Sequence, residues 1–209
     1  LFGKARNYET EKYGGIMDGK ENSWLVEGFV QGKYEFTEKM YVTAGINATW
    51  FDINQEYRVE PRLAASWQFH KNHRFSFGYG NHSQIEPLFV YFVRIEHDKD
   101  EMYYPNKTLD RMKAHHLVFG YDWSITPNLR LKIESYWQYL YDVPVVEGTA
   151  YSMINFLSDW TFNKKLTNKG TGTNMGIDFT LERFLKNGLY FMSTASLYDS
   201  EYSTGTNQT

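Results

Sequence analysis

The residues best suited to chemistry in this sequence include two adjacent histidines and a short acidic run. Imidazoles are zinc ligands, so His115 and His116 are candidates for a metal site. Neighbouring residues of a strand point to opposite faces, however, so we expect the two rings not to share a metal ion. The run from Glu96 to Glu101 offers carboxylates for Ca²⁺, but it lacks the glycine and the ligand spacing of an EF-hand loop. We therefore expect a solvated loop there.

A set of charged residues falls on one side of alternating segments, where paired carboxylates would divide the roles of acid and base. No nucleophile and no metal-ligand spacing accompanies these charges, and the inner wall of a large barrel is charged as well. The sequence therefore predicts no catalytic, metal-binding or cofactor-binding residue, and it assigns these side chains to a wall that faces water or a plug. They are Glu27, Lys33, Glu35, Arg62, Lys132, Glu134, Asp178 and Glu182.

The element that positions such side chains is clearest between Glu60 and Gln84, where two alternating arms flank the polar turn HKNH. Apolar residues occupy one face of the arms, and small or polar residues occupy the other. Each arm has roughly the ten residues that a tilted strand needs to cross a bilayer. The apolar face carries Leu63, Ala65, Trp67, Phe69, Phe75, Phe77 and Tyr79.

The same alternation recurs along the chain and predicts an all-β fold, an antiparallel up-and-down meander of about eight strands within a larger transmembrane β-barrel. Residues 1–22 are expected to be a loop because they are polar and contain Gly14-Gly15 and Asp18-Gly19. The predicted strands are 24–36, 40–52, 60–70, 74–84, 114–126, 129–142, 174–184 and 189–201.

The predicted connections alternate in length, as they do in bacterial outer-membrane barrels. Ile85–Lys113 and Val143–Thr173 are long and Ile53–Val59 is intermediate, whereas the other connections are short turns at Thr37–Lys39, Lys71–His73, Pro127–Asn128 and Leu185–Gly188. This order places both ends of the chain on the long-loop side. A complete small barrel would be expected to keep both termini on the other side, so we expect the chain to be part of a larger barrel.

Composition excludes several classes of protein. The 209 residues include 18% aromatics and no cysteine, which excludes disulfides and thiolate metal sites. No run approaches the roughly 18 apolar residues of a spanning helix, which excludes a helical membrane protein. A net charge of −3 gives no case for nucleic acid as a partner. The N-terminus lacks the features of a signal peptide, so a signal has been removed or the chain lies inside a longer protein.

Aromatic residues near the strand ends are typical of the girdles that barrels carry at both membrane interfaces. These residues include Trp24, Trp50, Tyr79, Trp123, Trp137, Tyr139 and Tyr141. The alternative is a soluble all-β binding module, for example for carbohydrate, which would use aromatic rings as stacking platforms. Such a module would bury rings in the middle of its strands and would have no need for eight membrane-length strands.

Several stretches also resemble a known family. EPRLAASWQF, RFSFGYGNHSQIEPLFVYF, KAHHLVFGYDWSITPNLRLKIESYWQYLYDVPV, NKGTGTNMGIDFTLERF and GLYFMSTASLYDSEY look like the later barrel strands of TonB-dependent outer-membrane receptors of Bacteroidota. The resemblance is to the subgroup with an N-terminal carboxypeptidase-regulatory-like domain. It covers most of the chain from Trp24 to Tyr202 and includes loop residues such as His82-Ser83-Gln84 and Pro87.

The resemblance implies a plugged barrel of the 22-strand class in the cell outer membrane. Such a receptor uses energy relayed through TonB to take up a scarce nutrient, such as a metal chelate, cofactor, glycan or peptide, and it holds no cofactor of its own. Its expected partners are membrane lipid, its plug domain and further strands, the TonB complex and the extracellular ligand. The sequence contains neither the plug nor the TonB-contacting segment, so this chain alone is not expected to transport. Ile85–Lys113 and Val143–Thr173 would be ligand-side loops, with no single binding residue identified.

Overall fold

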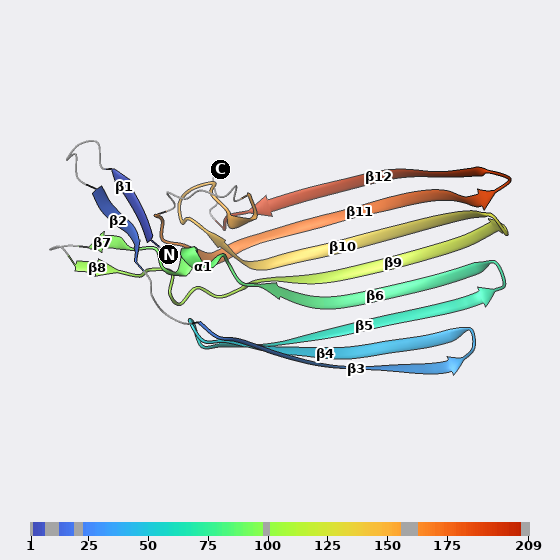
Figure 1. Cartoon of the computed structure of the whole chain (residues 1–209), viewed down its shortest axis with the longest axis horizontal. Coiled ribbons are helices and arrows are strands. Elements are labelled where there is room, and N and C mark those ends of the chain that lie inside the picture. The colour runs from blue at the N-terminus through green and yellow to red at the C-terminus, as the bar shows by residue number, and fades with distance from the viewer. Residues whose placement is uncertain (1, 7–12, 19–22, 98–100, 156–162, 206–209) are drawn as a thin grey trace.

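The computed structural model describes residues 2–6, 13–18, 23–97, 101–155 and 163–205, and its main element is one antiparallel sheet (Figure 1). The sheet has eight strands in the order β12-β11-β10-β9-β6-β5-β4-β3, so each strand lies beside the one that precedes it in this meander. The predicted all-β antiparallel meander of eight strands is confirmed. The strands are β3 (Leu25–Thr37), β4 (Met40–Phe51), β5 (Glu56–His70), β6 (His73–Gln84), β9 (Met112–Thr126), β10 (Leu129–Val145), β11 (Thr167–Lys186) and β12 (Leu189–Ser203).

Strand register gathers the alternating side chains onto two faces, because directly opposed residues of an antiparallel pair point the same way. Ala65 lies opposite Phe77, and Phe77 lies opposite Phe119. We call this the apolar face, which also carries Leu63, Ile133 and Phe179. We call the opposite one the polar face, which carries Arg62, Ser76, Lys132, Glu134 and Asp178.

The apolar face is uncovered within the described part of the chain. Phe119 is 57% exposed and Val30 is 70% exposed. The other strands described form two hairpins at one end of the sheet and not a second layer against it (Figure 1). A soluble sandwich would bury these side chains between two sheets, so the arrangement favours a face that contacts an apolar solvent.

The strands are joined by tight turns at one end and longer connections at the other (Figure 1). The turns are residues 38–39, 71–72, 127–128 and 187–188, and the connections at the other end are residues 52–55, 85–111 and 146–166. We call these the short-turn end and the long-loop end. Tight turns fix the register of each hairpin.

Gly188 closes one of these turns in the left-handed region. Its φ is 75° and that of Asn187 is 54°, as in a type I′ hairpin turn. We expect Gly188→Val to destabilise the β11–β12 hairpin by about 1–2 kcal/mol, because a branched side chain is strained at positive φ. To check this, samples of the full-length protein are heated to a series of temperatures and then run on a denaturing gel in the cold. The temperature at which the folded band disappears is the measured quantity. An unchanged unfolding temperature would contradict the assigned turn.

Two strands, β5 and β11, start well before the positions that the sequence indicates. β5 begins at Glu56 because Glu56 pairs with Phe51 and Tyr57 pairs with Trp50. The predicted connection Ile53–Val59 is therefore wrong, and a shorter connection of residues 52–55 replaces it. β11 begins at Thr167 because its pairing with β10 continues past Leu140 through two register shifts.

The predicted N-terminal loop is also wrong for the residues described there. β1 (Phe2–Arg6) and β2 (Tyr13–Asp18) form an antiparallel hairpin. Gly14 and Gly15 indicate a loop by composition, yet they lie within β2 and pair with Ala5 and Lys4. Backbone pairing holds them, because a glycine offers the same N–H and C=O groups as any other residue.

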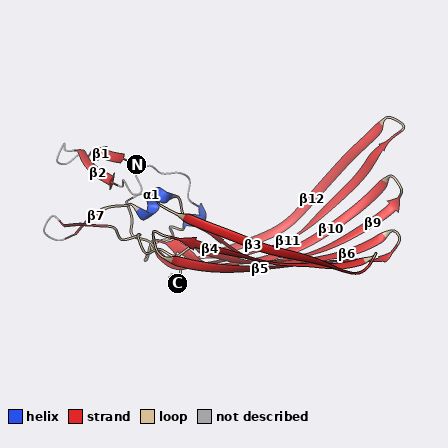
Figure 2. Cartoon of the chain, turned by 60° about the horizontal axis from the view of Figure 1, so that its bottom comes forward, coloured by secondary structure: helices blue, strands red, loops and turns tan. Residues whose placement is uncertain are grey.

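The sheet is curved and its two edges lie apart (Figure 2). In the described residues β3 pairs only with β4, and β12 pairs only with β11. Every residue of both edge strands is exposed. No described helix has the length and apolar character that crossing a membrane requires.

Candidate functional site

The two long connections pack together at the long-loop end. We call residues 85–97, 101–111, 146–155 and 163–166 the loop cap. It contains the helix α1 (Leu88–Tyr91), the hairpin of β7 (Ile95–His97) with β8 (Glu101–Tyr103), and the 3₁₀ turn η1 (Met153–Asn155). Sequence reasoning placed the ligand-side loops at Ile85–Lys113 and Val143–Thr173, and the structure brings these segments into contact.

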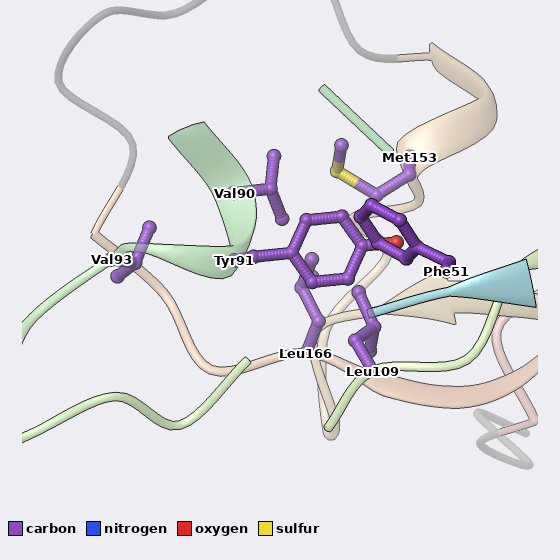
Figure 3. Packing of buried hydrophobic residues seen from close by; sticks show 7 residues of the cluster. All are labelled: Phe51, Val90, Tyr91, Val93, Leu109, Met153 and Leu166. Carbon is purple, nitrogen blue, oxygen red and sulfur yellow. The ribbon is translucent and has the colours of Figure 1, made fainter. Parts of the chain in front are cut away.

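An apolar core holds the loop cap against the sheet (Figure 3). Tyr91 is fully buried and meets Phe51 of β4 edge-on, with 5.4 Å between ring centroids. Phe51 occupies the polar side of its strand, where an apolar ring is unexpected unless a loop covers it. The other buried members are Val90, Val93, Leu109, Met153 and Leu166.

Two asparagines join the two loops through hydrogen bonds. Asn106 is fully buried, and its amide donates to the carbonyl oxygens of Val90 (3.2 Å) and Lys164 (2.9 Å) and accepts from the N–H of Leu166 (2.9 Å). Asn168 of β11 accepts from the N–H of Asp110 at 3.0 Å and donates to its carbonyl at 2.9 Å. Since buried backbone groups need partners, Asn106 positions one loop on the other, and Asn168 joins the first loop to β11.

Charged residues tie the base of the loop cap to the strands. Arg111 is 3% exposed, and its Nε lies 3.3 Å from Glu56 of β5. Its guanidinium also donates to Thr49 of β4 and lies 6.0 Å from the centre of the Phe51 ring. Next to it, Lys113 of β9 bridges to Asp142 of β10 at 2.8 Å, which joins these two strands where the cap begins. The cap is therefore anchored by opposite charges as well as by its apolar core.

The charges predicted for the wet wall lie on the polar face, and four of them form two ion pairs. Lys132 lies 2.5 Å from Glu134, and Lys33 lies 2.5 Å from Glu35. Glu134 faces Asp178 across the β10–β11 pair, and these are the best-placed carboxylates for acid and base roles. The described residues beside this pair include no nucleophile and no metal-ligand group, so an ion-paired wall is the simpler interpretation.

The polar face also carries a small concavity. A cavity of about 270 Å³ is lined by Arg62, His82 and His116 over a floor that includes Gly78 and Gly80. The rings of His82 and His116 are 6.5 Å apart. His115 points to the other face, where the Tyr79 hydroxyl lies 3.0 Å from its Nδ1. The predicted separation of His115 from His116 is confirmed.

Side chains replace backbone pairing where β5 and β6 part. The register between these strands ends at Arg62 and Gly80. Beyond it the Ser83 hydroxyl donates to Glu60 at 2.5 Å, and Arg58 donates to Asn81 (2.5 Å). These bonds keep the sheet continuous at the long-loop end.

No group of three or more histidines, aspartates and glutamates in the described residues is arranged to hold a metal ion. The acidic run belongs partly to the β7–β8 hairpin, in which His97 pairs with Glu101. Asp98, Lys99 and Asp100 lie outside the described residues. The segment that we expected to be a solvated loop therefore forms part of a β-hairpin, as far as the structure describes it.

Stacked rings lie on the apolar face near both ends of the strands. Toward the short-turn end, Phe75 stacks on Phe69 at 4.9 Å. Toward the long-loop end, Trp137, Tyr139 and Tyr141 stack in sequence with 6.1 Å between successive centroids. The predicted girdle residues include Tyr79, Trp137, Tyr139 and Tyr141. Their role at the membrane interface stays a prediction.

Burial changes the titration of two groups in the loop cap. It raises the pKa of Glu86 to about 7 and that of Tyr91 to about 12, because both groups lose contact with water. Glu147 is exposed, and its pKa is lowered by Lys169, which lies 2.5 Å away. Glu86 was not predicted as a functional residue from the sequence. Its apolar neighbours Ile85 and Pro87 were the one sequence feature that indicated burial, and they indicated it weakly.

Comparison of this chain with protein families and with solved structures gives results that agree with this geometry. A family model described as "TonB dependent receptor-like, beta-barrel" matches residues 5–209. The outer membrane transporter YddB from Escherichia coli is similar, with 11% identity over 92% of this chain and a TM-score of 0.66. The FrpB iron transporter from Neisseria meningitidis (F3-3 variant) is 11% identical over 86% of this chain, with a TM-score of 0.61.

This chain spans 27% and 26% of those two structures, about a quarter of their length. At this level of identity the likeness shows a shared fold. No curated protein matches the chain.

Proposed function

Because this chain belongs to the TonB dependent receptor-like β-barrel family, we propose that it forms part of the wall of an outer-membrane receptor. The receptor takes up a scarce nutrient with energy relayed through TonB. The observation that carries this proposal is the uncovered apolar face, which extends across the sheet and includes the exposed side chains Val30 and Phe119. Such a face is stable against lipid and unstable in water.

The two free edges support further barrel strands on both sides of this sheet. Edge strands present unpaired N–H and C=O groups, which cannot remain unpaired inside a bilayer. β3 and β12 would therefore each pair with a strand from outside this chain. The charged polar face would meet water and a plug domain, and TonB would be contacted through segments outside this chain.

The loop cap would lie on the extracellular side, where it meets the nutrient. Its position at the long-loop end supports this assignment, because long loops of such barrels lie outside the cell. The nutrient classes compatible with the family are metal chelates, cofactors, glycans and peptides. The resemblance of its sequence stretches supports an origin in Bacteroidota and a carboxypeptidase-regulatory-like domain in the full-length protein.

The test is made with the full-length protein in its own cells. We expect it in the outer-membrane fraction, and we expect deletion of its gene to abolish uptake of one compound from a labelled panel of haem, cobalamin, oligosaccharides and peptides. Complementation should restore uptake, and an uncoupler of the proton gradient should remove it again. Recovery of the protein in the soluble fraction, or uptake that persists without the proton gradient, would contradict the proposal.

A further inference from the structure

One glutamate of the loop cap is buried although it is ionisable. Glu86 lies between the end of β6 and α1 and is 7% exposed. Its backbone N–H donates to the Tyr91 hydroxyl at 3.3 Å, which ties it to the fully buried ring of α1. None of the described residues forms an ion pair or a hydrogen bond with its carboxyl group. A charge at this position would lose most of its hydration and would gain no ion pair with a described residue in return.

Two cations at the base of the cap have carboxylate partners other than Glu86. Arg111 is held by Glu56 of β5 at 3.3 Å. Lys113 of β9 lies 2.8 Å from Asp142 and 3.8 Å from Glu56. Arg94, which follows α1, has contacts of its own. Tyr91 is also beside Glu86, and its phenol is neutral at physiological pH; burial raises its pKa further, to about 12.

The position of Glu86 matters because the surrounding core is shared by both loops. Tyr91 and Val90 of the first loop pack against Met153 and Leu166, which belong to the second loop. Asn106 joins the same two loops by its three hydrogen bonds. A change that loosens α1 therefore loosens the contact between the loops.

We propose that Glu86 makes the loop cap a pH-responsive lid, which is packed while the Glu86 carboxyl group is neutral and loosens when that group ionises. This response of the cap depends only on its own packing. The consequence for access of a nutrient to the barrel rests on the proposed function.

The direction follows from the titration of Glu86. Burial raises its pKa from 4.5 to about 7 in the packed cap, whereas in an open cap the solvated group keeps its ordinary value. The stability that the neutral group provides is fully present below pH 4.5 and is lost as the pH rises through about 7. The fraction of open cap should increase roughly 10- to 100-fold between pH 5 and 7.5 and then become constant.

The test is hydrogen exchange of the full-length protein in outer-membrane vesicles, followed by mass spectrometry of the peptides that contain α1. Exchange rates are corrected for the intrinsic effect of pH. We expect protection of α1 in the native protein to fall about 10- to 100-fold between pH 5 and 7.5 and to level off above pH 7. Glu86→Gln should abolish this dependence, since glutamine stays neutral. Glu147→Gln, a matched change at an exposed carboxylate of the same cap, should retain it.

A fall in protection that is the same in native protein and Glu86→Gln would overturn the proposal, as would constant protection in the native protein. If Glu86→Gln does not assemble, the native profile decides: protection of α1 that stays constant between pH 5 and 7.5 overturns the proposal. This readout requires neither transport nor a known nutrient. A negative hydrogen-exchange result would therefore overturn the pH response alone. The proposed function is tested separately, by fractionation and uptake.

Discussion

Arginine in place of Phe119 is expected to prevent the full-length protein from assembling in the outer membrane. Phe119 is 57% exposed at the middle of the apolar face, with Phe77 as its cross-strand neighbour at 5.0 Å between ring centroids. A charged side chain facing lipid at the middle of a bilayer costs about 2–4 kcal/mol, because the guanidinium group loses its hydration there. That loss is a large share of the stability of a typical folded domain.

The measurement is the amount of folded protein in the outer-membrane fraction, judged by resistance to denaturation in cold detergent. Thr180→Arg is the matched control, because residue 180 lies on the polar face between Asp178 and Glu182. We expect that variant to assemble normally. Normal assembly of Phe119→Arg together with failure of Thr180→Arg would reverse the assignment of the two faces.

The second large effect is expected at Asn106. Its side chain is fully buried and makes three hydrogen bonds to the backbone of both loops. Asn106→Ala leaves two carbonyl oxygens and one N–H without partners, and each costs about 1–3 kcal/mol when buried. We expect the contact between the loops to weaken by roughly 3 kcal/mol or more, with the barrel strands unaffected.

Protease digestion of intact cells that display the full-length protein measures this effect. Cleavage within residues 85–111 should become at least tenfold faster in Asn106→Ala. Asn163→Ala changes an exposed asparagine of the same cap and should leave the rate unchanged. Equal rates in the two variants would show that Asn106 does not hold the loops together.

The alternation of side chains was sufficient to predict the sheet. Leu63, Phe77 and Phe119 repeat with period two along their strands, and a shift of one residue in any strand would move its apolar set to the polar face. Register was therefore strongly determined. The ends of strands were less determined, because Glu56–Val59 alternates two polar with two apolar residues and carries no turn signal to separate it from a connection.

The loop cap could not be predicted in detail because its contacts join residues far apart in the sequence. Asn106 bonds to Lys164 and Leu166, and nothing in the local sequence around any of them indicates the others. One signal was available. Phe51 is a large apolar ring on the polar side of β4 at the long-loop end, which indicates that something covers it. Its partner Tyr91 comes from a short helix that the sequence does not mark with a cap.

A cysteine scan of β10 in the full-length protein tests most directly which face of the sheet meets lipid. Residues 1–209 contain no cysteine. After any cysteine elsewhere in the full-length protein has been replaced, spin labels are placed singly at residues 131–138, and their collision rates with oxygen and with a water-soluble nickel chelate are compared in vesicles. We expect labels at Ile133, Ser135 and Trp137 to collide with oxygen, and labels at Lys132, Glu134 and Gln138 to collide with the chelate. The same preference at both sets of positions, or the reverse order, would contradict a barrel wall with its apolar face in the membrane.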